Sequence, residues 1–312
     1  MQWSLRSKNK SPETLGRVAV LMGGDSAERE VSLVTGKNIL EALQAMQVDA
    51  YGVDVGLDIA MQLQANRPDR AFIALHGPGG EDGVIQGLLE WMKIPYTGSD
   101  VTSSAVCMNK ALTKWIWQAN NIPTLPMHLI ADGENYQKQI EALGFPLCVK
   151  PIGEGSSVGV TRVDSWETLP AAIEKASQFK STIMLEPWIV GRELTVGIVG
   201  DYALPIIEIR PKTEFYNYKN KYQPGSTEYI CPAQIAEPLA REIRALSLKA
   251  FNLLGCRHWG RIDLMLDENE GIWLLENNTI PGMTGTSLVP KAAKFEGVNF
   301  EQLVYEILWQ SV

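Results

Sequence analysis

One predicted hairpin near the C-terminus constrains the fold more than any other stretch of the chain. Two apolar runs, Gly260–Leu266 and Ile272–Asn278, flank the short polar sequence 267–271, which is the pattern of antiparallel strands joined by a tight loop. Successive side chains on a strand point to opposite faces, and a loop of about four residues places Asp263 opposite Glu276. The hairpin therefore predicts two facing carboxylates.

Facing carboxylates repel each other unless positive charge lies between them. Arg261 shares the face of Asp263, lies opposite Asn278 and supplies part of that charge. A divalent cation would supply the rest, and the oxygen donors of Asp263, Glu276 and Asn278 suit Mg²⁺. The alternative is an ordinary hairpin whose acidic side chains face water.

The segment after the hairpin, Thr279–Ser287, is rich in Gly and Thr. Such a loop can present backbone N–H groups and hydroxyls to an anion. A metal site, an arginine and an anion-binding loop in sequence indicate phosphoryl chemistry.

The N-terminal part begins as an α/β unit. The apolar run Arg17–Met22 ends in two glycines, and a helical pattern follows over Ser26–Met46, with Ser26 as the expected N-cap and Glu28 in the first turn. Ligands bind at the carboxyl ends of strands in such units. The glycines do not form G-x-G-x-x-G, so a dinucleotide site is not supported. An acid favoured by the helix dipole is the alternative for Glu28.

Two further strands are expected at Tyr51–Asp54 and Ala71–Leu75, and the second leads into His76–Gly83, a loop with four glycines in eight residues. A helix is expected at Val84–Met92. We therefore predict a parallel α/β domain over residues 17–98, preceded by a disordered extension, 1–16.

Residues 99–189 are expected to form a second, smaller domain. It begins with a helix, Ser103–Asn120, that carries Lys110, and it contains Lys150 at a strand end before a Gly/Ser loop. A lysine beside backbone N–H donors is a phosphate-binding arrangement, although no Walker A sequence is present. Residues 190–312 form the third domain, whose polar stretch Arg210–Pro232 has the length of a functional loop.

Composition excludes several classes of protein. The net charge of −8 argues against nucleic acid as the main partner. The four cysteines form no C-x-x-C pair and are expected to be reduced. The first residues have no apolar core of a signal peptide, and no long apolar run predicts a membrane span. We expect a cytoplasmic enzyme with no membrane or nucleic-acid partner.

Several motifs in this order resemble the D-alanine–D-alanine ligases, which are ATP-grasp enzymes of cell-wall synthesis. The resemblance covers residues 17–309. It rests on GGDSAEREVSL (23–33), ALHGPGGEDG (74–83), VKPIGEGSSVGV (149–160), NKY (220–222), GRIDLML (260–266), and LENNTIPGMT (275–284) with SLVP (287–290).

The resemblance implies an N-terminal parallel, Rossmann-like α/β domain followed by a two-domain ATP-grasp fold. The expected fold class is α/β, or α+β for the chain as a whole. It implies that ATP and two D-alanines yield ADP, phosphate and D-alanyl-D-alanine through a D-alanyl phosphate. It also implies two Mg²⁺ ions, with Mn²⁺ as an alternative, and a homodimer.

Matching positions carry over the family's residue roles. Asp263, Glu276 and Asn278 would hold the metal ions, and Arg261 and Gly282 would stabilise the oxyanion. Glu28, in a triad with Ser156 and Tyr222, would bind the first D-alanine, and His76 would lie near its carboxylate. The second D-alanine would meet Ser287 and Leu288. ATP would be held by Lys110, Lys150, Glu186, Trp188, Ile189, Glu193 and Lys221, together with Asn278.

One departure from the family pattern concerns Asn109, where an aspartate is usual; it puts the orientation of Lys110 in question. The alternatives are a relative that joins D-alanine to D-serine or D-lactate, another ATP-grasp carboxylate–amine ligase, and a nucleotide sensor without catalysis. Tyr222 matches a tyrosine that depsipeptide-forming relatives lack, which favours an amine as the second substrate.

Overall fold

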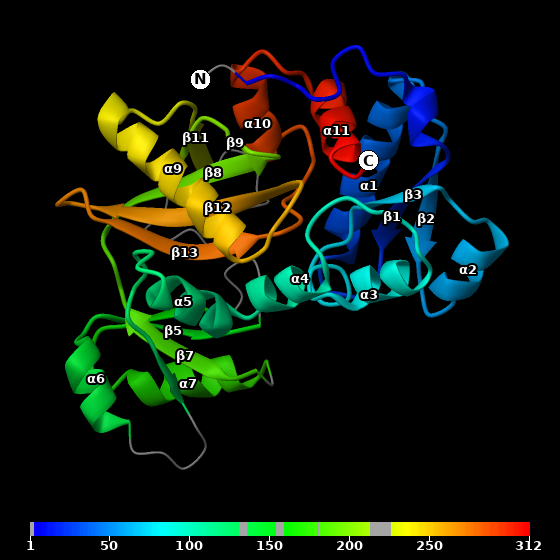
Figure 1. The fold of residues 1–312 in the computed structure, drawn as a ribbon. Coiled ribbons are helices and arrows are strands. Elements are labelled where there is room, and N and C mark those ends of the chain that lie inside the picture. Colours follow the sequence, from blue (N-terminus) through cyan, green and yellow to red (C-terminus); the bar gives the residue numbers. More distant parts are fainter. Residues whose placement is uncertain (1–2, 131–135, 154–158, 180, 213–225) are drawn as a thin grey trace.

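The structure, a computed structural model, describes residues 3–130, 136–153, 159–179, 181–212 and 226–312, and it contains three sheets (Figure 1). The first is parallel, in the order β2-β1-β3, and the mixed α/β class expected from the sequence is confirmed. The other two are antiparallel, in the orders β4-β7-β5-β6 and β11-β10-β8-β12-β13, with β9 paired to β8. The strands are β1 (Val18–Gly23), β2 (Ala50–Val55), β3 (Arg70–Ile73), β4 (His128–Ile130), β5 (Leu147–Pro151), β6 (Thr161–Val163), β7 (Ile183–Pro187), β8 (Gly191–Val199), β9 (Tyr202–Ala203), β10 (Ile207–Pro211), β11 (Thr227–Ile230), β12 (Trp259–Asp267) and β13 (Ile272–Asn278).

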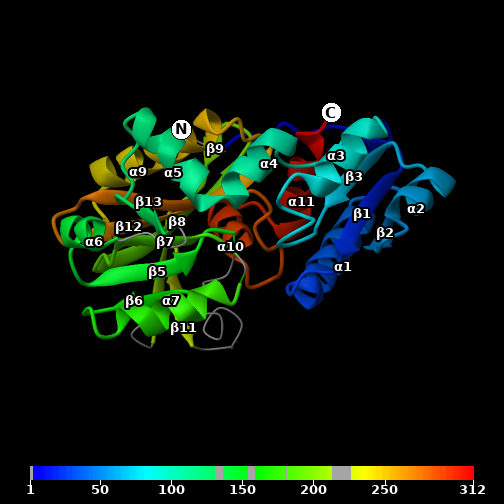
Figure 2. The same cartoon turned by 90° about the horizontal axis from the view of Figure 1, so that it is seen from below.

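Helices cover these sheets and connect them. In Figure 2 the four-stranded sheet lies beneath the six-stranded sheet, while the parallel sheet lies to one side. The helices are the 3-10 helix η1 (Pro12–Leu15) and the α-helices α1 (Arg29–Ala45), α2 (Ile59–Ala65), α3 (Val84–Trp91), α4 (Val101–Met108), α5 (Lys110–Ala119), α6 (Gln137–Leu143), α7 (Leu169–Ser177), α9 (Glu237–Leu253), α10 (Leu288–Phe295) and α11 (Phe300–Trp309). Among the described residues, no helix has both the length and the apolar composition needed to cross a lipid bilayer.

The first helix shows how the sequence fixes the N-terminal packing. Thr35, Ile39 and Leu43 are buried at helical spacing and form the face of α1 that covers the parallel sheet. Gly36 lies on the same face, where an added Cβ would stand 2.4 Å from the side chain of Met22 on β1. A glycine is therefore required for α1 to approach the sheet this closely.

The two ends of the chain meet at this lobe. Helix α11 packs against α1, so the last helix contributes to the core of the N-terminal lobe. Buried Glu306 of α11 accepts a hydrogen bond from the backbone N–H of Ser7 at 2.8 Å, and Trp3 stacks on the ring of Tyr202. The expectation of disorder before residue 17 therefore does not describe residues 3–16. The limits predicted for the three domains stay predictions.

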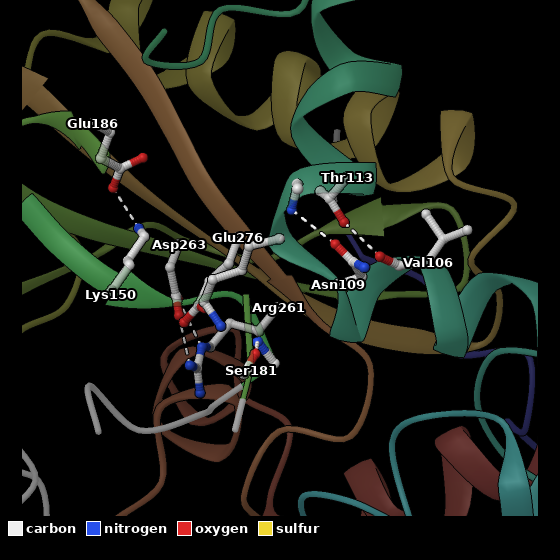
Figure 3. Close-up of polar contacts among 12 residues, drawn as sticks. Val106, Asn109, Thr113, Lys150, Ser181, Glu186, Arg261, Asp263 and Glu276 are labelled. Atoms are coloured by element: carbon white, nitrogen blue, oxygen red, sulfur yellow. Dashed lines mark hydrogen bonds and ion pairs between the residues drawn. The ribbon is translucent and has the colours of Figure 1, made fainter. Parts of the chain in front are cut away.

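One predicted helix, Ser103–Asn120, is in fact two helices. Asn109 is the N-cap of α5, with extended backbone at ψ 99°, and its side-chain oxygen accepts from the backbone N–H groups of Ala111 and Leu112, both at 3.1 Å (Figure 3). Asparagine is among the strongest N-cap residues. The cap interrupts the helix immediately before Lys110, so Lys110 is the first residue of α5 and its backbone position is fixed by the cap.

The predicted hairpin is formed by β12 and β13, and Asp263 lies opposite Glu276, as predicted. Near the turn, however, Leu264 pairs with Leu274, and the register shifts between Asp263 and Leu264. Leu275 is the extra residue of a β-bulge, which restores the predicted pairing. In a regular ladder that kept Leu275, Glu276 would lie opposite Ile262 and point to the other face of the sheet.

Candidate active site

A large cavity, with a volume of about 1210 Å³, brings the described candidate residues together. It is lined by strands of both antiparallel sheets, by the start of α1 and by the loop before α10. Every candidate site residue that the structure describes lines it, namely Glu28, His76, Lys110, Lys150, Glu186, Trp188, Ile189, Glu193, Arg261, Asp263, Glu276, Asn278, Gly282, Ser287 and Leu288. Ser156, Lys221 and Tyr222 lie outside the described residues.

The hairpin places alternating charges on the cavity wall. Arg261 donates to both carboxylate oxygens of Asp263, from Nε to Oδ1 at 2.8 Å and from Nη2 to Oδ2 at 2.6 Å (Figure 3). Thr195 of β8 donates to the same Oδ1 at 2.6 Å. Opposite, the Nζ of Lys110 lies 3.2 Å from Oε2 of Glu276. The two acids therefore share the wall with two cations, which offsets the repulsion expected from their register.

The donors at this wall fit a hard cation. The donors are the carboxylate oxygens of Asp263 and Glu276 and the amide oxygen of Asn278, and oxygen is the ligand atom that Mg²⁺ prefers. Within the described ranges, no group of three or more His, Cys, Asp or Glu side chains is arranged to hold a metal. The predicted set contains only two such residues, so it depends on Asn278 and on ligand oxygens.

A second group of residues surrounds the start of α1. Helix α1 begins at Arg29 with Glu28 as its N-cap residue, so the prediction of Ser26 as the cap was wrong. Ser26 instead donates to the carbonyl of His76 at 2.7 Å and accepts from the N–H of Glu28 at 3.2 Å. These bonds tie Glu28 to the glycine-rich loop predicted to lie close to a ligand. An added Cβ at Gly77, whose φ is +70°, would stand 3.1 Å from Oε2 of Glu28.

The imidazole of His76 is buried and neutral. Burial lowers its pKa from the usual value, and the nearby Glu28 carboxylate opposes that shift only in part. Its Nε2 lies 3.1 Å from the hydroxyl of Thr35. At neutral pH His76 can therefore act as a hydrogen-bond partner without adding a charge.

Glu81, which the sequence motifs did not single out, also lines the cavity. Its Oε2 accepts from the N–H of Gly77 at 2.7 Å. Burial, with the Glu28 carboxylate adding to it, raises the pKa of Glu81 to about 8. Glu81 is therefore mostly protonated at neutral pH. Its position five residues after His76 in a glycine-rich loop was the only sequence signal.

This pKa predicts a pH dependence of stability. The folded state holds a proton on Glu81 up to about pH 8, more tightly than the unfolded chain does. The stability gained from this proton is fully present below the pKa of Glu81 in the unfolded chain and is lost as pH rises through about 8. Glu81→Gln mimics the protonated form. Between pH 5 and 9, the melting temperature of the variant should rise relative to that of the unaltered protein as pH increases. A difference that stays constant with pH would contradict a protonated Glu81.

The far end of the cavity holds a buried ionic cluster. The ammonium of Lys150 on β5 contacts Oε1 of Glu186 on β7 (Figure 3), and the ammonium of Lys114 on α5 lies 3.0 Å from Oε2. Burial would raise the pKa of Glu186, but the two lysines hold it at about 2. Glu186 therefore stays ionised at any physiological pH. Lys150 and Glu186 were expected at the nucleotide, whereas Lys114 had no sequence signal.

Near this cluster lie the other residues assigned to the nucleotide. The N–H of Trp188 donates to the carbonyl of Pro146 at 2.8 Å, so this N–H is already used within the protein. Arg162 lies over the indole of Trp188, 5.7 Å from the ring centroid. Glu193 lies on β8, beside Met265 of β12. These residues line one side of the cavity between the two antiparallel sheets.

The loop that follows the hairpin ends at a helix N-terminus. Ser287 is the N-cap residue of α10, and its hydroxyl accepts from the N–H of Thr284 at 2.9 Å. That bond leaves the first N–H groups of α10 for a ligand, and helix N-termini favour anions. Gly282 lies across from Ser287, where an added Cβ would come within 3.2 Å of its hydroxyl. The predicted anion site thus has suitable donors.

Comparison with known proteins gives a consistent result. Residues 56–99 match the model of the D-ala D-ala ligase N-terminus, and residues 116–309 match that of the D-ala D-ala ligase C-terminus. The D-alanine–D-alanine ligase of Saccharophagus degradans is 46% identical over 298 residues, covering 96% of this chain and 95% of the relative. That of Acinetobacter baumannii is 48% identical over 299 residues, covering 95% and 96%.

Solved structures agree with the sequence matches. The D-alanine–D-alanine ligase of Bacillus anthracis complexed with ATP superposes with a TM-score of 0.85 at 32% identity, and the match covers 95% of this chain and 97% of the other. A second structure of that ligase gives a TM-score of 0.86 at 35% identity, with the same coverage.

Proposed function

Because the chain belongs to the D-alanine–D-alanine ligase family, we propose that its large cavity is where ATP drives the joining of two D-alanines. The ATP-dependent ligation of two D-alanines is the activity of this family member, and the dipeptide serves peptidoglycan synthesis. The observation that supports this location is the convergence of every described candidate residue on one cavity.

The chemistry begins with a carboxylate, which is a poor electrophile. The first D-alanine's carboxylate attacks the γ-phosphorus of ATP, the bond to ADP breaks, and an acyl phosphate forms. The ammonium groups of Lys110 and Lys150 would neutralise the phosphate oxygens, a task that preorganised charges perform without reorganisation. Asp263, Glu276 and Asn278 would hold two Mg²⁺ ions, which supply Lewis-acid polarisation of the phosphates when bound.

The second step breaks the acyl phosphate. The second D-alanine's amine attacks the acyl carbon, an oxyanion develops, and phosphate leaves as the amide forms. Arg261 would face that oxyanion while its bidentate grip on Asp263 fixes the guanidinium plane. The N–H of Gly282 is the second proposed donor. Both donors are on or directly after the hairpin, so the sheet fixes their spacing.

The two amino acids would occupy the cavity end formed by α1 and α10. The Glu28 carboxylate would accept from the first ammonium, and neutral His76 would lie beside the carboxylate. The N-terminus of α10, at Ser287 and Leu288, would bind the second carboxylate. The proposed partners of Glu28, Ser156 and Tyr222, lie outside the described residues.

A single coupled assay tests this function. ADP release is measured with D-alanine, L-alanine, D-serine or D-lactate, and the dipeptide is identified by mass spectrometry. We expect ADP release with D-alanine and much less with the others. Preferred use of D-lactate or D-serine as second substrate would make the chain a different ligase. ATP binding with no phosphate release in the presence of D-alanine would make it a nucleotide sensor.

Two further proposals come from the family. A homodimer should sediment at twice the 34.5 kDa of one chain. A cytoplasmic location agrees with the need for ATP and with four free cysteines, although Cys107 and Cys256 bring their Sγ atoms within 3.4 Å of each other. Fractionation of cells and detection of the protein with an antibody would test the location.

A further inference from the structure

Lys114 is completely buried, with 0% of its side chain exposed. It lies on α5 one turn after Lys110 and directs its ammonium to three acceptors. These are Oε2 of Glu186 at 3.0 Å, the hydroxyl of Thr124 at 2.8 Å and the carbonyl of Leu125 at 3.3 Å. The contacts with Thr124 and Leu125 are hydrogen bonds, and the contact with Glu186 is an ion pair.

The contact with Glu186 completes a symmetric arrangement. Lys150 holds one carboxylate oxygen from β5, and Lys114 holds the other from α5. Two cations on separate elements fix both the charge and the plane of the acid. A buried ion pair gives little net stability compared with apolar residues of similar volume, because desolvation offsets the attraction. The cluster is therefore better explained by a role in the site than by a role in folding.

The other contacts of Lys114 lead to the hairpin. Thr124, which accepts from Lys114, donates its own hydroxyl proton to the carbonyl of Leu274 at 2.7 Å. Leu274 is on β13, two residues before Glu276. One turn earlier on the same helix, Lys110 pairs with Glu276 itself. Helix α5 thus contacts the proposed metal strand through one lysine and the proposed nucleotide acid through the other, and a rigid helix keeps these points at a fixed spacing.

We propose that Lys114 is a positioning residue for the nucleotide: it holds Glu186 ionised and in place, and it ties that acid to the strand that carries Glu276. The inference rests on the proposed nucleotide role of the cavity. It assigns Lys114 no contact with substrate, so its effect must pass through Glu186.

Lys114→Met is the direct test, because methionine approximates the length of the side chain without its charge. We expect the KM for ATP to rise at least about tenfold at pH 7.5, with a smaller change in kcat. The unaltered protein keeps Glu186 ionised, since its pKa is about 2. With one cation removed that pKa rises, so the KM of the variant should climb further as pH falls toward 6, whereas the KM of the unaltered protein should stay flat.

The matched control is Lys37→Met, which removes an exposed lysine paired with Glu41 on α1. It should change neither KM nor its pH profile. Thermal unfolding reports on folding of each variant. Lys114→Met that folds with an unaltered KM and a flat pH profile would overturn the inference.

A double-mutant cycle tests whether Lys114 acts through Glu186. Glu186→Gln alone leaves two buried lysines facing a neutral amide. Adding Lys114→Met to this variant should therefore raise the KM for ATP by a smaller factor than it does in the unaltered protein. If Lys114 acted independently of Glu186, the fold-change in the double variant would be the product of those in the two single variants. Multiplying fold-changes would therefore also overturn the inference.

Thr124→Val keeps every charge and removes one acceptor of the ammonium, and it serves even if Lys114→Met fails to fold. We expect a rise in the KM for ATP of about threefold, and an unchanged KM would overturn the inference. Failure of the unaltered protein to ligate D-alanine would instead refute the proposed function. The two failures are thus distinguishable.

Discussion

Glu276→Gln is expected to lower kcat by about 100- to 1000-fold while leaving the fold intact. Glutamine keeps the shape of the side chain and the hairpin pairing with Asp263. It removes the charge that would hold the metal ions and that now pairs with Lys110 at 3.2 Å. ADP release at saturating ATP and D-alanine measures the loss. The Mg²⁺ concentration for half-maximal rate should also rise. Asp263→Asn should behave in the same way.

Glu268→Gln is the matched control for this experiment. Glu268 is an exposed acid in the loop of the same hairpin, outside the large cavity. Its substitution should leave kcat unchanged. If Glu276→Gln also kept the rate of the unaltered enzyme, the metal role proposed for the hairpin would be wrong. Glutamine keeps the shape of the side chain, so an unchanged rate would mean that the charge of Glu276 is not needed.

The second large effect is expected for Arg261→Met, with kcat reduced about 100- to 1000-fold and the KM for ATP changed far less. The guanidinium is proposed to face the oxyanion, a charge that exists only as the amide bond forms, so its loss should appear in kcat. Arg261→Lys retains the charge but loses the fork that grips both oxygens of Asp263. It should recover only part of the rate.

Steady-state kinetics with ATP and D-alanine varied separately give the required constants. Arg244→Met, on the outer helix α9, serves as the control for loss of an arginine. A large rise in the KM for ATP with kcat unchanged would move Arg261 to a role in holding the ground state. The same result for both arginines would indicate a general effect of charge.

The hairpin shows what the sequence could predict. Alternation along two apolar runs placed Asp263 opposite Glu276, and the structure has that pairing. The bulge at Leu275 could not be predicted, because it depends on a local shift that no residue type marks. The helix that ends at Met108 could have been found, since Asn109 is a strong cap followed by a helix former.

Lys114 and Glu81 show what the sequence could not predict. A lysine between helix-forming and aromatic residues has the pattern of a solvated position, and its burial depends on Glu186, which is distant along the chain. Glu81 lies in a glycine-rich loop, but its raised pKa depends on burial beside Glu28, which is distant along the chain. Both effects come from tertiary packing, which local patterns do not encode. The roles of Ser156, Lys221 and Tyr222 stay predictions.

The bulge in β13 decides which face of the sheet Glu276 occupies. Asn277, on the opposite face, donates to the Sγ atoms of Cys107 and Cys256 at 3.1 and 3.0 Å. A regular ladder that kept Leu275 would place Glu276 opposite Ile262, turn Glu276 and Asn278 toward those thiols and bring Asn277 into the cavity. Deleting the codon for Leu275 would instead remove the extra residue and leave Glu276 opposite Asp263, so an in-frame deletion here would preserve the wall of the site.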